Sequence, residues 1–319
     1  MTETPLRDAP AWVGVAASVI RRLPRGRYRA TNWVGRYRTD PFWARMPDDL
    51  GPLWFRCDLR DRMMREVCFT GRYEPQETAL LQLLLRPGMT FVDVGANWGY
   101  FSLAAAGMVG PSGRVVSVEA DPRACRTLRA NMARNILDVA VLEMAASDRS
   151  GTLQLQEYEA DASDSGSYGV AATTTVVEGG RAFTVAARAL DDALDDAGVG
   201  RIDLLKMDIE GGEARALAGL RRRLADRRID RILLEVHPNH LRDQGSSAEV
   251  VVGELRAQGF NVRTIDHSPS AARRVGAGRL DVTAALAPLT DMTDLGPWPH
   301  LLCELGDGRA NAGDLPHGH

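Results

Sequence analysis

Residues 89–122 constrain the fold more than any other stretch of the chain. Their sequence, MTFVDVGANWGYFSLAAAGMVGPSGRVVSVEADP, begins with a short apolar run of β-formers at 90–94, which a glycine turn ends. This run predicts a buried strand, and the small, apolar segment 101–108 predicts a helix. A second apolar run, 114–118, predicts another strand that ends at Glu119. Such a unit crosses over right-handed and leaves its loops at the carboxyl edge of a parallel sheet, where ligands bind.

The glycine turn favours a positively charged ligand. It contains Gly95 and Gly99 but lacks the middle glycine of the G-x-G-x-x-G pattern that binds dinucleotides. A carboxylate, Asp93, precedes the turn by two residues, where it would repel a pyrophosphate and attract a cation. S-adenosylmethionine carries an ammonium and a sulfonium, and Glu119 is placed to accept both of its ribose hydroxyls. The pattern therefore predicts an S-adenosylmethionine site.

The rest of the chain continues the alternation of strands and helices. Further apolar runs predict strands at 140–145, 202–207, 231–236, 260–265 and 301–305. Helical patterns separate most of them, and residues 208–213 are expected to lead into a helix that runs through Leu224. Alternation of this kind predicts an α/β fold with a doubly wound, mostly parallel sheet. Residues 267–299 read as an irregular excursion.

Polar residues follow two of these strands. Asp208 comes directly after 202–207, while Glu235 and His237 lie two residues apart at the end of 231–236 and so point to one side. Lys206 is the only lysine in a chain rich in arginine, which suggests that a compact ammonium is required there. Neighbouring parallel strands would bring these four side chains together beside the methyl donor.

Two mechanisms fit this group, and both activate a hydroxyl. His237 can take the hydroxyl proton as general base, tuned by Glu235 or Asp208. Alternatively, Asp208 and Glu235 bind a divalent cation such as Mg²⁺ that acidifies the hydroxyl. We prefer the histidine route because imidazole is a poor magnesium ligand. Lys206 would pair with a carboxylate or hold a developing alkoxide.

The motifs VDVGANWGYFS, VEADP, MAASDRSG, LLKMDIEGGE and LLEVHP resemble those of the FkbM-type methyltransferases, a branch of the class I S-adenosylmethionine-dependent enzymes. The similarity extends from about residue 73 to about residue 266. It implies a Rossmann-like, seven-stranded sheet with an antiparallel last strand, and a methyltransferase domain at 73–305 with an inserted loop or hairpin at 157–182. It also implies O-methylation of polyketide or sugar hydroxyls, in natural-product or glycan biosynthesis.

The expected cofactor and acceptor residues combine these arguments. For the cofactor they are Asp93, Gly95, Asn97, Gly99, Phe101, Glu119, Ala120, Ser147, Asp148 and Glu74. Of these, Ser147, Asp148 and Glu74 are implied by the resemblance. It places Ser147 and Asp148 near the adenine, and it places Glu74, at the entry to the helix before the first strand, near the cofactor. For the acceptor they are Tyr100, Ser167, Tyr168 and His240.

Net charge and composition limit the kinds of partner and the location that this chain can have. The formal net charge of −3 argues against a general binder of polyanions. Four cysteines without C-x-x-C spacing fit a reducing cytosol, and no apolar run is long enough for a membrane span, so a cytoplasmic location is expected. Residues 1–72 mix arginine with aromatic residues and are interpreted as a lid or oligomer contact, while 306–319 are predicted to be disordered.

Two other functions stay open. The arginine-rich and aromatic N-terminal stretch could bind RNA, which would make the protein an RNA-modifying methyltransferase. However, the sequence after Asp208 lacks the prolines and the ring that stack a flipped base, so a nucleobase acceptor is disfavoured. A non-catalytic S-adenosylmethionine-binding module is the remaining alternative.

Overall fold

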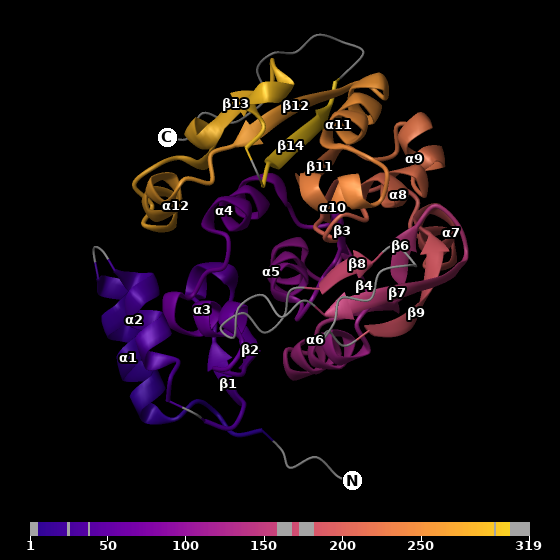
Figure 1. Ribbon diagram of the computed structural model, residues 1–319. Helices are drawn as coiled ribbons and strands as arrows, with labels where there is room; N and C mark the ends of the chain where they lie inside the picture. Colours follow the sequence, from indigo (N-terminus) through magenta and orange to yellow (C-terminus); the bar gives the residue numbers. More distant parts are fainter. Residues whose placement is uncertain are drawn as a thin grey trace.

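The computed structural model describes residues 6–23, 26–37, 39–157, 168–171, 182–296 and 298–306. Its centre is an eight-stranded sheet of order β13-β12-β14-β11-β10-β3-β4-β5 (Figure 1). These strands are β3 (Thr90–Val94), β4 (Arg114–Glu119), β5 (Val139–Glu143), β10 (Leu204–Met207), β11 (Arg231–Glu235), β12 (Phe260–Ile265), β13 (Leu286–Pro288) and β14 (His300–Leu305).

The pairing of the strands fixes where a ligand can bind. From β5 to β11 all neighbours are parallel, whereas β14 is antiparallel to both β11 and β12. The predicted α/β sheet with an antiparallel last strand is confirmed. It has eight strands rather than seven because β13 pairs with β12 at the edge. The strand order reverses between β3 and β10, and ligands bind at the carboxyl ends of strands at such a switch point.

Helices cover both faces of the sheet, as parallel strands buried on both sides require. Successive strand residues alternate between the two faces, so Phe91 and Val115 belong to one core while Val92 and Val116 belong to the other. The first core contains α4 (Pro75–Leu84), α5 (Tyr100–Val109), α6 (Pro122–Arg134) and α12 (Pro269–Gly276). The second contains α7 (Leu190–Asp196), α8 (Glu213–Ala218), α9 (Arg221–Ala225), α10 (Pro238–Asp243) and α11 (Ala248–Ala257).

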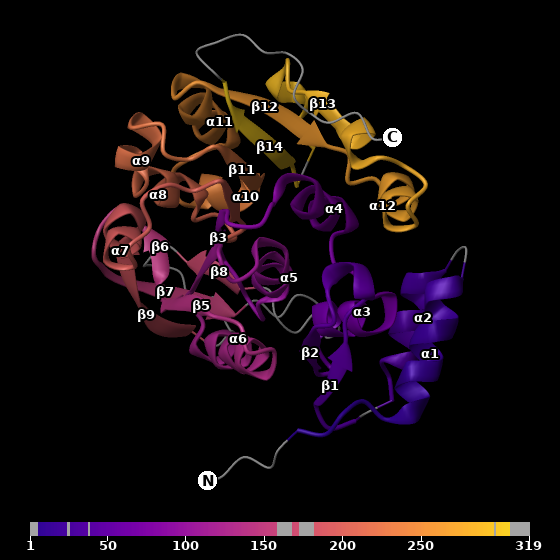
Figure 2. The same cartoon turned by 180° about the vertical axis from the view of Figure 1, so that it is seen from behind.

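The N-terminal segment shares the first core. Its elements are α1 (Ala11–Arg22), α2 (Arg27–Val34), β1 (Phe42–Arg45), η1 (Asp48–Leu50), β2 (Trp54–Cys57) and α3 (Arg62–Thr70). Asn135, which directly follows α6, accepts from the Trp54 backbone N–H and donates to the Trp54 carbonyl, both at 2.7 Å. Asn131 accepts from the Arg56 N–H at 2.8 Å. Strand β2 therefore packs onto the end of α6, and in both views α1, α2 and α3 lie on the side of the molecule opposite the second sheet (Figures 1 and 2).

That second sheet was not expected in this form. It consists of β6 (Ala145–Ser147), β7 (Gly151–Glu157), β8 (Tyr168–Ala171) and β9 (Ala182–Ala189), in the order β6-β9-β7-β8. The strand predicted at 140–145 ends at Glu143, and the chain bends at Met144, whose N–H still donates to the Glu119 carbonyl at 2.9 Å. The chain then enters β6. Of the predicted insertion loop, Glu157 ends β7 and Tyr168–Ala171 forms β8, while Ala182 begins β9; the intervening residues lie outside the described ones.

Two predictions about helices were wrong. The helix expected to run through Leu224 is divided at Gly219, where a Cβ would lie 1.9 Å from the Ser147 carbonyl oxygen. The excursion 267–299 contains α12, η2 (Val282–Ala285), β13 and η3 (Met292–Asp294), which are too short for periodicity to reveal. Residues 307–319 lie outside the described part of the chain. None of the described helices is long and apolar enough to cross a membrane.

Candidate active site

A pocket lies at the carboxyl ends of β3, β4 and β10. Its cavity volume is about 120 Å³. One wall is apolar and consists of Met144, Ala145, Ala146, Leu153 and Leu155. The polar side chains on the other walls are those of Asn97, Glu119, Asp208, Glu210 and Arg215.

The glycine turn is pressed against the end of β10. Gly95 has φ of +85°, and a Cβ there would lie 1.8 Å from the Asp208 carbonyl oxygen. The N–H groups of Gly95 and Ala96 both donate to the Val118 carbonyl, at 2.9 and 3.1 Å. Only glycine fits this turn, and its close approach sets Asp208 at the pocket wall.

Glu119 is held by the backbone on both of its oxygens. Oε2 accepts from the Asn97 N–H and Oε1 from the Asp121 N–H, each at 2.7 Å. Burial raises the pKa of Glu119 to about 7, against the lowering effect of these N–H groups. Because each carboxylate oxygen can accept a second hydrogen bond, Glu119 is fixed in place and still able to accept two hydroxyls.

His237 lies in a cage of carboxylates and is 2% exposed. Its Nδ1 lies 2.7 Å from Glu213 Oε1. Its Nε2 lies 3.5 Å from Glu210 Oε2, 3.5 Å from Glu235 Oε1 and 3.9 Å from Asp208 Oδ1. The structure thus brings Asp208, Glu235 and His237 together as the strand order predicted, and adds Glu210 and Glu213.

These carboxylates control the protonation of His237. Burial lowers the pKa of the ring, but hydrogen bonds to Glu213 and Glu235 and the charges of Asp208 and Glu210 raise it to about 11. In the absence of ligands the imidazole therefore carries a proton at neutral pH. Glu213 is itself fully buried, and its Oε1 also accepts from the Gly211 N–H at 3.0 Å.

Lys206 is a buried cation behind the pocket. Its Nζ lies 3.4 Å from Asp208 Oδ2 and 4.6 Å from the centre of the Phe101 ring. Strand pairing sets it beside Asp93. Burial lowers the pKa of Lys206, but the carboxylates of Asp208 and Glu74, among others, raise it further, so the net shift is upward. Lys206 therefore serves as a permanent counter-charge.

Comparison with known proteins identifies the family. The model of the methyltransferase FkbM domain matches residues 93–262. The 31-O-demethyl-FK506 methyltransferase FkbM of Streptomyces tacrolimicus is 31% identical over 202 residues, which are 56% of this chain and 75% of the relative. The chain belongs to the FkbM methyltransferase family.

The 2-O-methyltransferase NoeI of Sinorhizobium fredii is 28% identical over 151 residues, covering 44% of this chain and 60% of NoeI. A solved structure of methyltransferase FkbM from Methylobacillus flagellatus aligns over 91% of this chain and 60% of its own, with 14% identity and a TM-score of 0.38.

The pocket of this FkbM methyltransferase fits S-adenosylmethionine, the methyl donor on which such enzymes depend. Glu119 offers acceptors for a pair of hydroxyls, and the apolar wall suits an adenine ring. The Oδ1 atom of Asn97 is buried without a hydrogen-bond partner. Asp208 and Glu210 give one end of the pocket the negative charge that a sulfonium and an ammonium require.

The expected cofactor residues are divided by the structure. Gly95, Asn97, Glu119 and Ala120 are among the residues that line the pocket. The others, Asp93, Gly99, Phe101, Ser147, Asp148 and Glu74, are not. Asp93 is 1% exposed, and its Oδ2 accepts from Ser102 at 2.6 Å. Ser147 lies in β6 beyond the apolar wall and contacts Asp148, which is exposed.

The four predicted acceptor residues have different outcomes. Tyr100 is fully buried, and its hydroxyl lies 3.1 Å from Thr78 Oγ1, so it belongs to the core and is not reached by an acceptor. His240 does lie at the site, stacked on His237 with ring centres 5.8 Å apart. Ser167 and the side chain of Tyr168 lie outside the described part of the chain.

Several residues of the site were missed from the sequence. Glu210 and Glu213 follow Asp208 in the run DIEGGE, so the density of acids after a strand was the available signal. Glu74 was expected at the cofactor, but its carboxylate lies within 4.8 Å of ligand atoms of Asp208 and Glu235. No pattern around residue 74 indicates this, because α4 reaches the site only through tertiary packing.

Proposed function

We propose that this protein transfers the methyl group of S-adenosylmethionine to a hydroxyl of a small metabolite or sugar moiety, in natural-product or glycan biosynthesis. The observation that carries the proposal is the position of His237, whose Nε2 lies beside Asp208 and Glu210, two residues that line the pocket. An aliphatic hydroxyl keeps its proton at neutral pH, so the transfer needs a group that removes this proton as the oxygen attacks.

The names of two relatives agree with a hydroxyl acceptor. One is a 31-O-demethyl-FK506 methyltransferase and the other is a 2-O-methyltransferase. We carry over only the class of the accepting atom, since each acts on its own substrate. We further propose residues 73–305 as the methyltransferase domain, with residues 1–72 as an N-terminal extension whose strand β2 contacts α6.

The chemistry requires few groups from the chain. Bound S-adenosylmethionine supplies a methyl group whose bond to sulfur breaks as the bond to oxygen forms. His237 Nε2 takes the hydroxyl proton, while Glu213 holds Nδ1–H and so fixes the tautomer. Lys206 holds Asp208 in place and stabilises negative charge that develops on the oxygen.

His237 must lose its resting proton before it can act as a base. Its pKa of about 11 is maintained by Glu213 and Glu235 together with the negative charges of Asp208 and Glu210. Positive charge bound at the pocket end near Asp208 and Glu210 offsets these charges and lowers the pKa of the ring. The general-base route therefore predicts that methyl transfer becomes faster as the pH rises above neutrality.

Activation of the hydroxyl by a bound divalent cation is the alternative to the histidine base. The carboxylates of Glu74, Asp208 and Glu235 have ligand atoms within 4.8 Å of one another, a set of oxygens that would suit Mg²⁺. Activity that is abolished by EDTA and restored by Mg²⁺ would favour this route. Full activity in EDTA, combined with an inactive His237→Ala, would favour the histidine.

The test of the function is metabolite profiling with S-adenosylmethionine labelled at its methyl group. Extracts are incubated with the wild type, with His237→Ala, and with Asn239→Ala, an exposed neighbour that serves as control. We expect label in an O-methyl product with the wild type and the control only. Label in RNA or at nitrogen would refute the proposal, as would a protein that binds the donor in calorimetry but labels nothing.

A further inference from the structure

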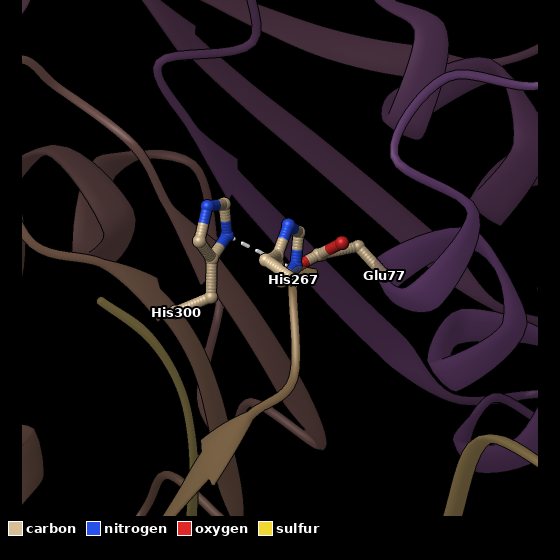
Figure 3. Close-up of side chains that lie close together, drawn as sticks. All are labelled: Glu77, His267 and His300. Carbon is tan, nitrogen blue, oxygen red and sulfur yellow. Dashed lines mark hydrogen bonds and ion pairs between the residues drawn. The ribbon is translucent and has the colours of Figure 1, made fainter. Parts of the chain in front are cut away.

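Glu77, His267 and His300 come together from three separate elements. Glu77 lies on α4, His267 follows β12, and His300 begins β14 (Figure 3). The family domain matched at 93–262 contains none of the three residues. None of them is among the residues that line the cofactor pocket. The cluster is thus separate from the groups that hold the cofactor.

The three side chains are in direct contact. Glu77 Oε1 lies 2.5 Å from His267 Nε2 and 2.9 Å from His300 Nδ1. The two rings stack, with centres 3.4 Å apart and planes inclined by 8°, and Figure 3 shows both beside the Glu77 carboxylate. Glu77 is 3% exposed, whereas the side chains of His300 and His267 are 11% and 25% exposed. The site is therefore buried at the carboxylate and open to solvent at His267.

We propose that Glu77, His267 and His300 bind a divalent transition-metal ion, with Zn²⁺ as the best match. The ligands are the Glu77 carboxylate, His267 Nε2 and His300 Nδ1, whose atoms lie within 4.8 Å of one another. Two imidazoles and one carboxylate are a donor set that zinc accepts, with a fourth position left for water. Magnesium and calcium prefer oxygen donors, so they fit this cluster less well.

An independent observation also indicates a ligand. The second carboxylate oxygen, Glu77 Oε2, is buried and has no hydrogen-bond partner. A buried carboxylate oxygen that has no partner destabilises the folded protein. A cation bound to both oxygens of Glu77 would remove this destabilisation.

Neighbouring residues hold the proposed ligands in position, as they do at known metal sites. The ring nitrogen of His300 that does not face Glu77, Nε2, lies 3.7 Å from Glu235 Oε1. A carboxylate on the second nitrogen of a ligating histidine fixes its orientation and increases its basicity. Gln76 donates from Nε2 to the Asp266 carbonyl at 2.8 Å, which ties α4 to the segment that carries His267.

Binding requires a small rearrangement. Ligand atoms about 2.0–2.1 Å from a tetrahedral zinc lie roughly 3.3 Å apart, and stacked rings do not direct both lone pairs at one point. His267 must therefore turn out of the stack, which its exposure and its position after a strand allow. The metal takes the place of the two protons that the facing nitrogens of His267 and His300 donate to Glu77.

A metal ion at this cluster would cross-link separate segments of the chain beside the candidate active site. A bound ion would link α4, the end of β12 and the start of β14, three segments that are far apart in sequence. It would also fix His300, which contacts Glu235. Because the unfolded chain lacks this arrangement, binding stabilises the folded state in proportion to the logarithm of the metal concentration.

The experiment measures metal binding by the full chain rather than activity. Zn²⁺ is titrated by calorimetry and Co²⁺ by absorption between 500 and 650 nm, where tetrahedral nitrogen and oxygen ligation gives intense bands. The variants are His267→Ala and Glu77→Gln. The controls are Glu210→Gln, which alters the other histidine and carboxylate cluster, and a variant with both His317→Ala and His319→Ala, which removes the tail histidines.

We expect one equivalent of Zn²⁺, an increase in Tm with the metal, and at least tenfold weaker binding by His267→Ala, with both controls like the wild type. His267 is the main test because it is the most exposed ligand, and circular dichroism checks that the variant is folded. Two results would overturn the proposal: a wild type that binds no Zn²⁺ or Co²⁺ at 100 µM, or binding that survives His267→Ala and is lost in a control. Neither readout depends on methyl transfer, so the proposed function can fail independently.

Discussion

Gly95→Ala is the substitution that the geometry of the pocket constrains most strongly. The new Cβ would lie 1.8 Å from the Asp208 carbonyl oxygen, whereas carbon and oxygen in close contact are about 3.3 Å apart. The overlap of about 1.5 Å cannot be relieved locally. Gly95 and Ala96 are tied to Val118 by their N–H groups, and the Asp208 N–H is tied to the Val94 carbonyl at 3.0 Å.

The expected cost has two parts. Alanine at φ of +85° costs about 1–2 kcal/mol because its Cβ disfavours the left-handed region. Overpacking against a backbone that cannot retreat adds about 1–3 kcal/mol. Moving Asp208 by about 1 Å would also displace a group that must be held close to the acceptor, and such a displacement can reduce a rate about 100-fold.

Gly245→Ala is the matched control. Gly245 has φ of +74°, but nothing lies within 4 Å of a Cβ built there, so its substitution incurs the backbone cost alone. We expect Gly95→Ala to unfold about 2–12 °C below Gly245→Ala, from roughly 2–4 °C per kcal/mol. We also expect S-adenosylmethionine binding in calorimetry to be lost only in Gly95→Ala. Equal Tm values and equal binding for the two variants would refute the reasoning.

Three further predictions concern charged groups. Glu119→Gln should weaken S-adenosylmethionine binding about tenfold in calorimetry, because hydrogen bonds to a charged acceptor are stronger by about 1–1.5 kcal/mol. The affinity of the wild type for S-adenosylmethionine should decrease as the pH falls below 7, because burial raises the pKa of Glu119 to about 7 and the carboxylate is then protonated. Lys206→Met should lower the unfolding free energy in urea by about 3 kcal/mol, since it leaves Asp208 beside other carboxylates without its cation; an unchanged midpoint would contradict this. Folding raises the pKa of His237, so its contribution to stability is complete below about pH 6.5 and is lost as the pH rises toward 11. Glu213→Gln should move that loss to lower pH, which urea unfolding from pH 6 to 9 measures, and a variant whose stability falls in parallel with the wild type would show that Glu213 does not set the pKa.

The local parts of the fold and the donor site could be predicted from the sequence. Thr90–Val94 and Phe260–Ile265 form the strands expected at those positions, since short-range periodicity and turn residues decide them. Gly95 and Glu119 line the pocket because a strand–turn–helix–strand unit places them there whatever surrounds it. The meeting of Asp208 with Glu235 and His237 also followed, since it needs only the neighbouring positions of two parallel strands.

Tertiary structure alone decided the rest. The sequence could not reveal that Tyr100 is buried, that the chain leaves the main sheet at Met144, or that Glu213 contacts His237 from the start of α8. The cluster of Glu77, His267 and His300 joins residues up to 223 positions apart. Such contacts depend on strand register and on how helices pack over the sheet, and no local pattern encodes either. The sequence predicted S-adenosylmethionine as the ligand, whereas packing determined which charges surround His237.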